Sequence, residues 1–269
     1  MKELIRSSSN KNIKLVKALQ MKKTRDEQNL FIIEGEKLLK EALDYNVNIS
    51  FALLSENYTE QPKSEELTAV LESKGVPILF AENRIFGEAG ETETPQGILA
   101  VAEKLCFDFD VVTEQDALCF LLLDGVRDPG NVGTIVRTAD ACGIDAVILT
   151  KGCADLYNGK TIRSTMGSLF HIPVFQNADP VETLKVFREK GIVTIGAAPR
   201  SEMNCIEMQD FEKSAIIIGN ESQGIRSETM LLLDYKVNIP MPGRAESLNA
   251  GIAAAIMMYE IAVRKKYSK

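Results

Sequence analysis

Hydrophobic positions in the first hundred residues form short continuous runs separated by mixed stretches. The runs at 30–33, 49–54, 76–80 and 97–102 have the length and continuity of β-strands. Between them, the stretches 35–45, 64–74 and 82–88 are predicted helices, and in the first of these leucine and alanine recur at helical spacing. This alternation of strands and helices predicts a small α/β unit.

A second series of apolar runs begins at residue 117. The run 117–123 is too short and too continuous for an amphipathic helix and is typical of a buried parallel strand. Further strands are predicted at 146–150, 171–175, 192–197, 215–218 and 236–239, with helices at 131–142 and 180–190, a short helix after residue 150, and a long final helix from 247. The predicted fold class is α/β, with a mainly parallel sheet and helices on both faces.

The stretch between the two series is acidic and weakly patterned. We place a linker at 105–116, which divides the chain into an N-terminal domain at 1–104 and a C-terminal domain at 117–269. A chain of 269 residues, 45% of them hydrophobic, has enough apolar material for two such domains.

Polar residues and glycines indicate where the helices of the second half begin and end. Asn131 is expected to cap the helix that Gly143 ends, and Ser247 is expected to cap the final helix. The first turns of that final helix have almost no polar face. The helix must therefore be buried in its own subunit or pack against another chain, and the pattern permits both.

Composition excludes several classes of protein. No window approaches the roughly 18 consecutive apolar residues of a membrane span, and the N-terminus lacks the apolar core of a secretory signal. The 5 cysteines are odd in number and widely spaced, which favours a reducing cytoplasm over a disulfide scaffold or a zinc site. The 1 histidine, His171, lies in an apolar run and is expected to be structural. No metal is expected.

The net charge of −7 argues against a nucleic-acid partner, but its distribution changes that picture. Residues 1–25 contain 8 basic residues and 1 acidic residue, and the C-terminal tail adds Arg264, Lys265, Lys266 and Lys269. Such clusters either neutralise phosphates locally or form solvated helix faces. Charge alone leaves both interpretations open.

Three segments of the second half place polar residues and glycines where strands end, the edge at which open α/β sheets bind ligands. The first is Asp128-Pro-Gly-Asn-Val-Gly-Thr-Ile-Val-Arg137, in which Arg137 is either a fixed cation near that edge or the partner of Asp140 on the helix surface. The second is Ile217-Ile-Gly-Asn-Glu-Ser-Gln-Gly-Ile225, a glycine loop that carries Glu221. The third is Ile239-Pro-Met-Pro-Gly-Arg-Ala-Glu-Ser-Leu-Asn249.

The glycine loop does not match the common nucleotide motifs. Gly219 and Gly224 have the spacing of a phosphate loop, but Ile225 and Arg226 follow where a lysine and a serine or threonine are required. The dinucleotide fingerprint G-x-G-x-x-G is also absent. A nucleotide hydrolase is therefore a remote alternative. The loop is otherwise a generic strand–turn–helix connection with a structural role alone.

Taken together, the three segments resemble the three motifs of the SpoU (TrmH-type) RNA 2′-O-ribose methyltransferases, of the SPOUT superfamily. The resemblance is carried, in order and spacing, by Asp128-Pro-x-Asn131-x-Gly133-x-x-x-Arg137, Gly219-Asn-Glu221-x-x-Gly224-Ile225 and Ile239-Pro-Met241 followed by Ser247-Leu248-Asn249. It covers roughly residues 117–265, and the first hundred residues are similar to the family's RNA-binding domain. Ala250 stands where a valine commonly follows the asparagine.

The resemblance implies a trefoil knot in the C-terminal domain, S-adenosylmethionine as methyl donor, structured RNA as substrate and a homodimer packed through the C-terminal domain. It implies catalytic roles for Asn131, Arg137, Glu221, Ser247 and Asn249. It also implies that the donor is bound around Ala197, Gly219, Ile239, Met241 and Leu248. Ribosomal RNA is the favoured substrate because of the separate N-terminal domain, with transfer RNA as the alternative.

The chemistry of these residues agrees with methyl transfer, which needs in-line positioning rather than a metal. A guanidinium remains protonated in proteins, so we expect Arg137 to grip a phosphate and orient the hydroxyl rather than to accept its proton. Asn131, Ser247 and Asn249 would hold that arrangement, and Glu221 would orient Arg137 or bind the substrate. A non-catalytic RNA-binding protein is a further alternative, although it would not need this set of residues.

Overall fold

The computed structural model describes residues 3–92, 94–114 and 118–264. These residues form two compact units. The first unit holds the chain up to Cys106 together with Tyr157–Phe170, and the second holds Phe107–Leu156 and the chain from His171 onward. Ala117, where the first strand of the second half was expected to begin, lies outside the described residues, as do residues 115–116 of the expected linker and the lysines of the tail.

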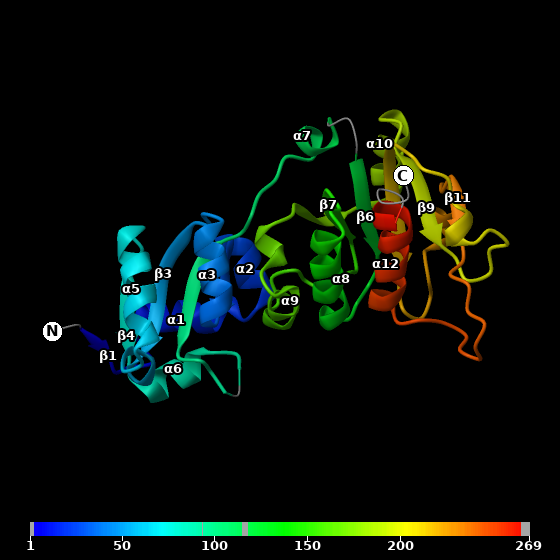
Figure 1. Ribbon diagram of the computed structural model, residues 1–269. Helices are drawn as coiled ribbons and strands as arrows, with labels where there is room; N and C mark the ends of the chain where they lie inside the picture. The colour runs from blue at the N-terminus through cyan, green and yellow to red at the C-terminus, as the bar shows by residue number, and fades with distance from the viewer. Residues whose placement is uncertain (1–2, 93, 115–117, 265–269) are drawn as a thin grey trace. The chain divides into compact units, whose positions relative to one another are not determined.

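The first unit contains a mixed five-stranded sheet in the order β1-β4-β3-β5-β2 (Figure 1). Strand β4 pairs in parallel with both β1 and β3, whereas β5 is antiparallel to both β3 and β2. The strands are β1 (Leu4–Ile5), β2 (Leu30–Glu34), β3 (Ile49–Ser55), β4 (Ile78–Ala81) and β5 (Ile98–Glu103). The predicted small α/β unit is confirmed, and each strand predicted in it is present.

Helices cover this sheet and bury its apolar side chains. Residues of α1 and α6, such as Val16 and Phe86, pack with Leu53 of β3 and Leu99 of β5. The helices of this unit are α1 (Lys11–Leu19), α2 (Lys22–Gln28), α3 (Glu36–Asp44), α4 (Glu56–Thr59), α5 (Lys63–Ser73), α6 (Asn83–Ala89), α9 (Gly159–Thr165) and the short helix η1 (Ser168–Phe170).

Helix α9 comes from the middle of the sequence yet belongs to the first unit. It contacts β2, and just before it the Tyr157 ring lies 4.7 Å from the Phe31 ring, centroid to centroid. The Tyr157 hydroxyl also accepts a hydrogen bond of 2.9 Å from the backbone N–H of Leu105. The sequence predicted a short helix after residue 150 but not the unit into which it packs.

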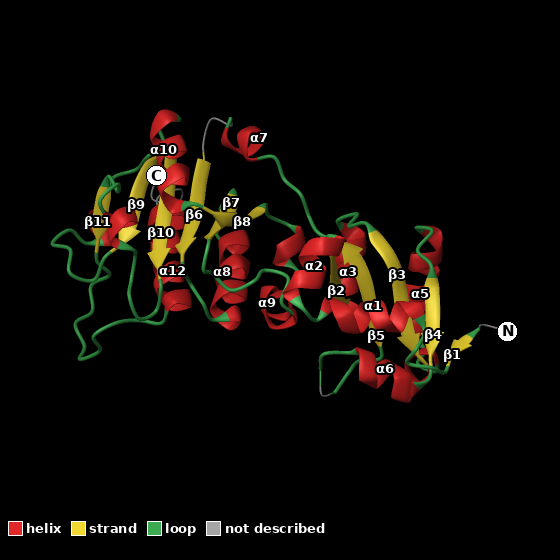
Figure 2. Cartoon of the chain, turned by 180° about the vertical axis from the view of Figure 1, so that it is seen from behind, coloured by secondary structure: helices red, strands yellow, loops and turns green. Residues whose placement is uncertain are grey.

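The second unit contains a six-stranded sheet in the order β11-β9-β10-β6-β7-β8 (Figure 2). All neighbouring strands in it are parallel. The strands are β6 (Leu118–Asp124), β7 (Ala146–Thr150), β8 (Val174–Ala178), β9 (Val193–Ala197), β10 (Lys213–Gly219) and β11 (Tyr235–Val237). This confirms the predicted parallel sheet. The knot stays a prediction.

Helices lie on both faces of the second sheet, as predicted. Helices α8 and α12 pack on one face, and α10 packs on the other, where Phe187 stacks on Phe120 with ring centroids 5.2 Å apart (Figure 1). The helices are α7 (Phe109–Thr113), α8 (Pro129–Ala141), α10 (Pro180–Glu189), η2 (Cys205–Glu207), α11 (Ser227–Met230), α12 (Ala250–Met258) and the π-helical turn η3 (Tyr259–Val263). No helix among the described residues is long and apolar enough to cross a bilayer.

Both predicted helix caps of the second unit were wrong. Asp128, not Asn131, caps α8, because its side chain accepts a 2.8 Å bond from the Asn131 N–H and Pro129 fits the first helical position, where no N–H is needed. Asn249, not Ser247, caps α12, with its side-chain oxygen accepting from the N–H groups of Gly251 and Ile252. The predicted C-terminal end of α8 before Gly143 is confirmed.

Two other predicted elements differ from the structure. The strand expected at 171–175 is β8 at Val174–Ala178, because η1 and Pro173 occupy the preceding residues. The expected linker contains α7, whose Phe109 packs edge-on against Phe175 at 5.1 Å between ring centroids. This acidic stretch gave no helical signal, and the partly buried ring of Phe109 packs the helix against the core of the second unit.

The carboxyl ends of the central strands meet at one edge of the second sheet. Gly219 at the end of β10 pairs with Asp124 at the end of β6, and Ala197 at the end of β9 pairs with Val237 of β11. Immediately after β10 the backbone doubles back, so that a Cβ on Gly219 would lie 2.1 Å from the backbone of Gly224 and Ile225. Only glycine allows this approach.

Gly219→Ala is therefore expected to lower the free energy of unfolding by about 1–3 kcal/mol, because the methyl group meets backbone that has no free space to move into. Gly87→Ala in α6 is the matched control, since a Cβ there meets nothing within 4 Å and a helical alanine stabilises by up to about 1 kcal/mol over glycine. Thermal and urea denaturation of both variants measure the difference. Equal stability of the two would contradict the close approach.

Candidate functional site

A chain of side-chain hydrogen bonds joins the three sequence segments at this edge. The N–H groups of Gly251 and Ile252 donate to Asn249 Oδ1 at 2.8 and 3.3 Å. Asn249 Nδ2 in turn donates to Asn131 Oδ1 at 3.0 Å, and Asn131 Nδ2 donates to Glu221 Oε1 at 2.9 Å. The chain runs in one direction, from the N-terminus of α12 to a carboxylate.

This arrangement fixes the orientation of both amides. Because Asn249 Oδ1 accepts from backbone N–H groups, its nitrogen must face Asn131, and the Asn131 nitrogen must then face Glu221. The Glu221 carboxylate is exposed to solvent. The site therefore presents an anchored acidic group with acceptor capacity left for a ligand.

Arg137 does not join this chain. It follows Asn131 by six positions on α8, which places the two side chains roughly 120° apart around the helix. Its side chain is exposed and forms no hydrogen bond or ion pair with any residue in the described ranges. The alternative pairing with Asp140 is wrong, because the Asp140 carboxylate lies 2.8 Å from Nδ1 of His171. That contact joins His171 to α8, and its structural role stays a prediction.

The remaining predicted residues lie in or beside the loops at the strand ends. Ala197 and Gly219 are the last residues of β9 and β10, and Ile239 follows β11 by two residues. Met241 and Leu248 are partly exposed in the long segment that leads to α12, and Ser247 is exposed there. The structure thus brings Asn131, Glu221 and Asn249 into contact, whereas Ser247 and Arg137 stand apart from them.

A polar hollow lies next to Glu221. It has a volume of about 420 Å³ and is lined by Arg127, Asp128, Pro129 and the residues 220–223. Arg127 is exposed. This hollow offers hydrogen-bond donors and acceptors, as a site for a polar ligand requires.

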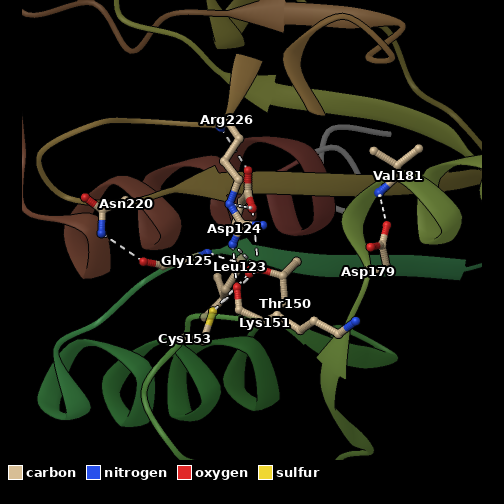
Figure 3. Close-up of polar contacts among 10 residues, drawn as sticks. All are labelled: Leu123, Asp124, Gly125, Thr150, Lys151, Cys153, Asp179, Val181, Asn220 and Arg226. Carbon is tan, nitrogen blue, oxygen red and sulfur yellow. Dashed lines mark hydrogen bonds and ion pairs between the residues drawn. The ribbon is translucent and has the colours of Figure 1, made fainter. Parts of the chain in front are cut away.

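The sequence patterns missed a buried ion pair beside the candidate site. Asp124 is fully buried at the end of β6, and its Oδ1 lies 3.2 Å from Nε of Arg226 in the loop after β10 (Figure 3). A charged residue that closes the apolar run at 118–123 was a signal that something must pair with it. The identity of that partner depends on the sheet order, which the sequence does not state.

Cys153 lies beside the same strand end, where its Sγ donates to the carbonyl oxygen of Leu123 at 3.1 Å (Figure 3). Burial raises the pKa of its thiol above the usual value, against the smaller opposing effect of neighbouring hydrogen bonds. The thiol is therefore protonated at neutral pH and is a structural group rather than a nucleophile. Among the described residues, no group of three or more His, Cys, Asp or Glu side chains is placed to hold a metal ion.

Two family models match separate parts of the chain. Residues 119–259 match the SpoU rRNA Methylase family, and residues 10–100 match the MRM3-like substrate binding domain. The first match spans the parallel sheet and all three segments of the candidate site.

Individual relatives cover the chain almost completely. The 23S rRNA (guanosine(2553)-2′-O)-methyltransferase RlmP of Bacillus subtilis (strain 168) is 39% identical over 263 residues, covering 96% of this chain and 98% of its own. The AdoMet-bound rRNA methyltransferase from Sinorhizobium meliloti has a TM-score of 0.85 at 28% identity and covers 99% of both chains. The SpoU methyltransferase AviRb from Streptomyces viridochromogenes, in complex with AdoMet, has a TM-score of 0.87 at 29% identity over 96% of this chain and 99% of its own.

These matches confirm the resemblance carried by the three motifs. The substrate-binding match covers most of the mixed sheet of the first unit, and the methylase match covers the parallel sheet of the second unit. The protein belongs to the SpoU rRNA methylase family.

Proposed function

We propose that this protein transfers the methyl group of S-adenosylmethionine to a ribose 2′-hydroxyl of ribosomal RNA. The observation that carries the proposal is the hydrogen-bond chain Asn249–Asn131–Glu221 at the carboxyl edge of the sheet, in a member of the SpoU family. Relatives named as 23S rRNA 2′-O-methyltransferases favour ribosomal RNA over transfer RNA as the substrate. A non-catalytic RNA-binding protein would not need this series of hydrogen bonds.

S-adenosylmethionine supplies an electrophilic methyl group when it is bound. We assign its binding to the loops that begin at Ala197, Gly219 and Ile239, with Met241 and Leu248 as apolar contacts. The fit rests on chemistry: strand ends offer unpaired backbone groups to a polar ligand, while the partly exposed Ile239, Met241 and Leu248 offer apolar surface to an adenine ring.

The chain's own residues position the ribose. Glu221, held by Asn131, accepts a hydrogen bond from a substrate hydroxyl, and Asn249 fixes Asn131 in the orientation that this requires. Arg137 carries a permanent charge with no described partner, so it grips a backbone phosphate and orients the nucleotide. Ser247, exposed in the loop before α12, adds a hydrogen bond to the substrate. Such positioning removes much of the entropic barrier to an in-line transfer.

The wild-type protein is expected to place label from methyl-labelled S-adenosylmethionine on ribose 2′-oxygens of 23S rRNA. Asn249→Asp keeps the oxygen that caps α12 but replaces the amide donor that faces Asn131, so the rate should fall about 100-fold with little loss of stability. Asn249→Ala should lose the same activity and about 1 kcal/mol of stability in addition. Arg137→Ala should lose transfer while it keeps donor affinity.

Asn158→Asp is the matched control, because Asn158 caps α9 through the N–H of Lys160 and takes no part in the site. It should keep full activity. Methylation of bases instead of ribose, or wild-type turnover in Asn249→Asp, would contradict the proposal.

We further propose that residues 1–104 form the RNA substrate-binding domain and 117–269 the methyltransferase domain, joined by 105–116. Lys11, Lys14 and Lys22 on α1 and α2 are exposed and form no ion pair with a described residue. Lys17 is instead neutralised by Glu88 at 3.0 Å. Free cations on neighbouring helices suit the phosphate backbone of RNA.

Lys11→Gln/Lys14→Gln/Lys22→Gln is expected to raise KM for RNA about tenfold at moderate salt and to flatten its dependence on salt, with kcat unchanged. The control Lys63→Gln/Lys185→Gln/Lys190→Gln removes the same charge from lysines that are already ion-paired. Steady-state kinetics over a salt series compare the two. An equal rise in KM in both variants would leave Lys11, Lys14 and Lys22 without a special role in RNA binding.

We also propose a cytoplasmic homodimer. All five cysteines are free, as in a reducing compartment. Ile252 and Tyr259, two helical turns apart near the end of the chain, are 53% and 55% exposed, and so present an apolar face that a second copy would cover.

Ile252→Glu/Tyr259→Glu is expected to halve the molar mass of the protein in solution, because a charge cannot be buried unpaired in an interface. Leu231→Glu, at a leucine that is 80% exposed elsewhere in the second unit, should leave the mass unchanged. Sedimentation velocity measures both. A wild-type protein that is monomeric at micromolar concentration would refute the dimer.

A further inference from the structure

Arg226 contacts both oxygens of the Asp124 carboxylate, to which the Thr150 hydroxyl also donates at 3.4 Å. Asp124 is 0% exposed, and its Oδ2 accepts a 2.9 Å hydrogen bond from the backbone N–H of Arg226. Its Oδ1 lies 3.2 Å from Nε of the same arginine. Arg226 therefore binds both carboxylate oxygens: its backbone N–H donates to one, and its guanidinium pairs with the other (Figure 3).

The same guanidinium reaches the next strand. Its Nη2 donates to Oγ1 of Thr150 at 3.3 Å and to the carbonyl oxygen of Lys151. The Thr150 hydroxyl accepts from the N–H of Gly125 at 3.1 Å. Gly125 and Gly152 have φ of +75° and +97°, and a Cβ on either would lie 3.4 and 3.5 Å from Nη2. The guanidinium thus fits between two glycine turns at the ends of β6 and β7.

These contacts fix the far end of the loop that carries Glu221. At the near end, Asn220 Nδ2 donates to the carbonyl oxygen of Gly125 at 2.8 Å. Asn220 and Gly224 exchange backbone hydrogen bonds of 2.9 Å in both directions. Between these two fixed points, Glu221, Ser222 and Gln223 are exposed to solvent. The Glu221 carboxylate itself contacts Asn131 and, at 3.4 Å, Asn220 Nδ2. Its place therefore depends on how the two ends of the loop hold Asn220 and Gly224.

We propose that Arg226 is a positioning residue for methyl transfer. By binding Asp124 and the end of β7, Arg226 fixes the position of the loop 220–226. The position of the loop in turn determines where the Glu221 carboxylate lies relative to Asn131. This inference rests on the proposed function. Its physical basis is that a displacement of about 1 Å in a positioning group lowers the rate about 100-fold, whereas an exposed loop has few other contacts to prevent one.

Arg226→Ala tests the role in the full-length protein. It should lower kcat about 100-fold, with KM for RNA and Kd for S-adenosylmethionine within about threefold of wild type. Methylguanidinium at tens of millimolar should restore at least about tenfold of the loss, because it refills the space between Gly125 and Gly152. Methylammonium should not, since it lacks the planar donor set. Arg188→Ala, at an exposed arginine of α10, should show neither effect.

A second variant covers the case in which Asp124, left unpaired, prevents folding. Asp124→Asn/Arg226→Ala removes the buried charge together with its partner, keeps an acceptor for the backbone N–H of residue 226, and should show the same loss of kcat. Amide hydrogen exchange gives a readout that needs no catalysis. The N–H groups of Asn220 and Gly224 should exchange at least about tenfold faster in both variants than in wild type, with β6 unchanged.

The outcomes separate the two proposals. A wild-type protein that methylates no RNA, together with faster loop exchange in the two variants, would refute the proposed function and with it the catalytic part of this inference. Normal methyl transfer in wild type, with kcat in the variants within threefold of it, would overturn the positioning role alone. A loss of kcat without faster loop exchange and without methylguanidinium rescue would overturn it as well.

Discussion

A buried carboxylate must have partners on its oxygens, because an unpaired charge in the interior costs several kcal/mol. Asp124 imposes this requirement at the centre of the second sheet, and Arg226, 102 residues further along the chain, meets it. The pair can form only if β10 lies directly beside β6 and ends level with it, as the pairing of Gly219 with Asp124 shows. The pairing of β6 with β10 and the place of the candidate site are thus linked by one buried ion pair.

The site itself depends on neutral, directional hydrogen bonds. Asn249 both caps α12 and orients Asn131, so the start of a helix and the geometry of the site are set by a single side chain. An aspartate would cap as well but would not donate, and a serine would not reach as far. Position 249 therefore needs both an oxygen that caps α12 and an N–H that donates to Asn131, and asparagine supplies both.

The sequence predicted the strands and most helices of both units because their apolar runs are continuous and well separated. The sequence-based predictions were wrong where the type of a residue favours one position and the folded turn selects another. Asn131 and Ser247 are good capping residues by type, yet Asp128 and Asn249 do the capping, since the local turn decides which oxygen meets the free N–H groups. For the site, the three motifs named Asn131, Glu221 and Asn249, and these are in contact. Arg226 could not be found this way, because its role depends on a strand order that no local pattern encodes.

The first unit is discontinuous in sequence, since it is completed by Tyr157–Phe170. During synthesis the chain emerges from the N-terminus, so the strands β2 and β5 are available long before Tyr157 can cover the ring of Phe31. By the time α9 emerges, β6 and β7 of the second unit have already left the ribosome. The first unit is therefore complete only when more than half of the protein has been made, after synthesis of the second unit has begun.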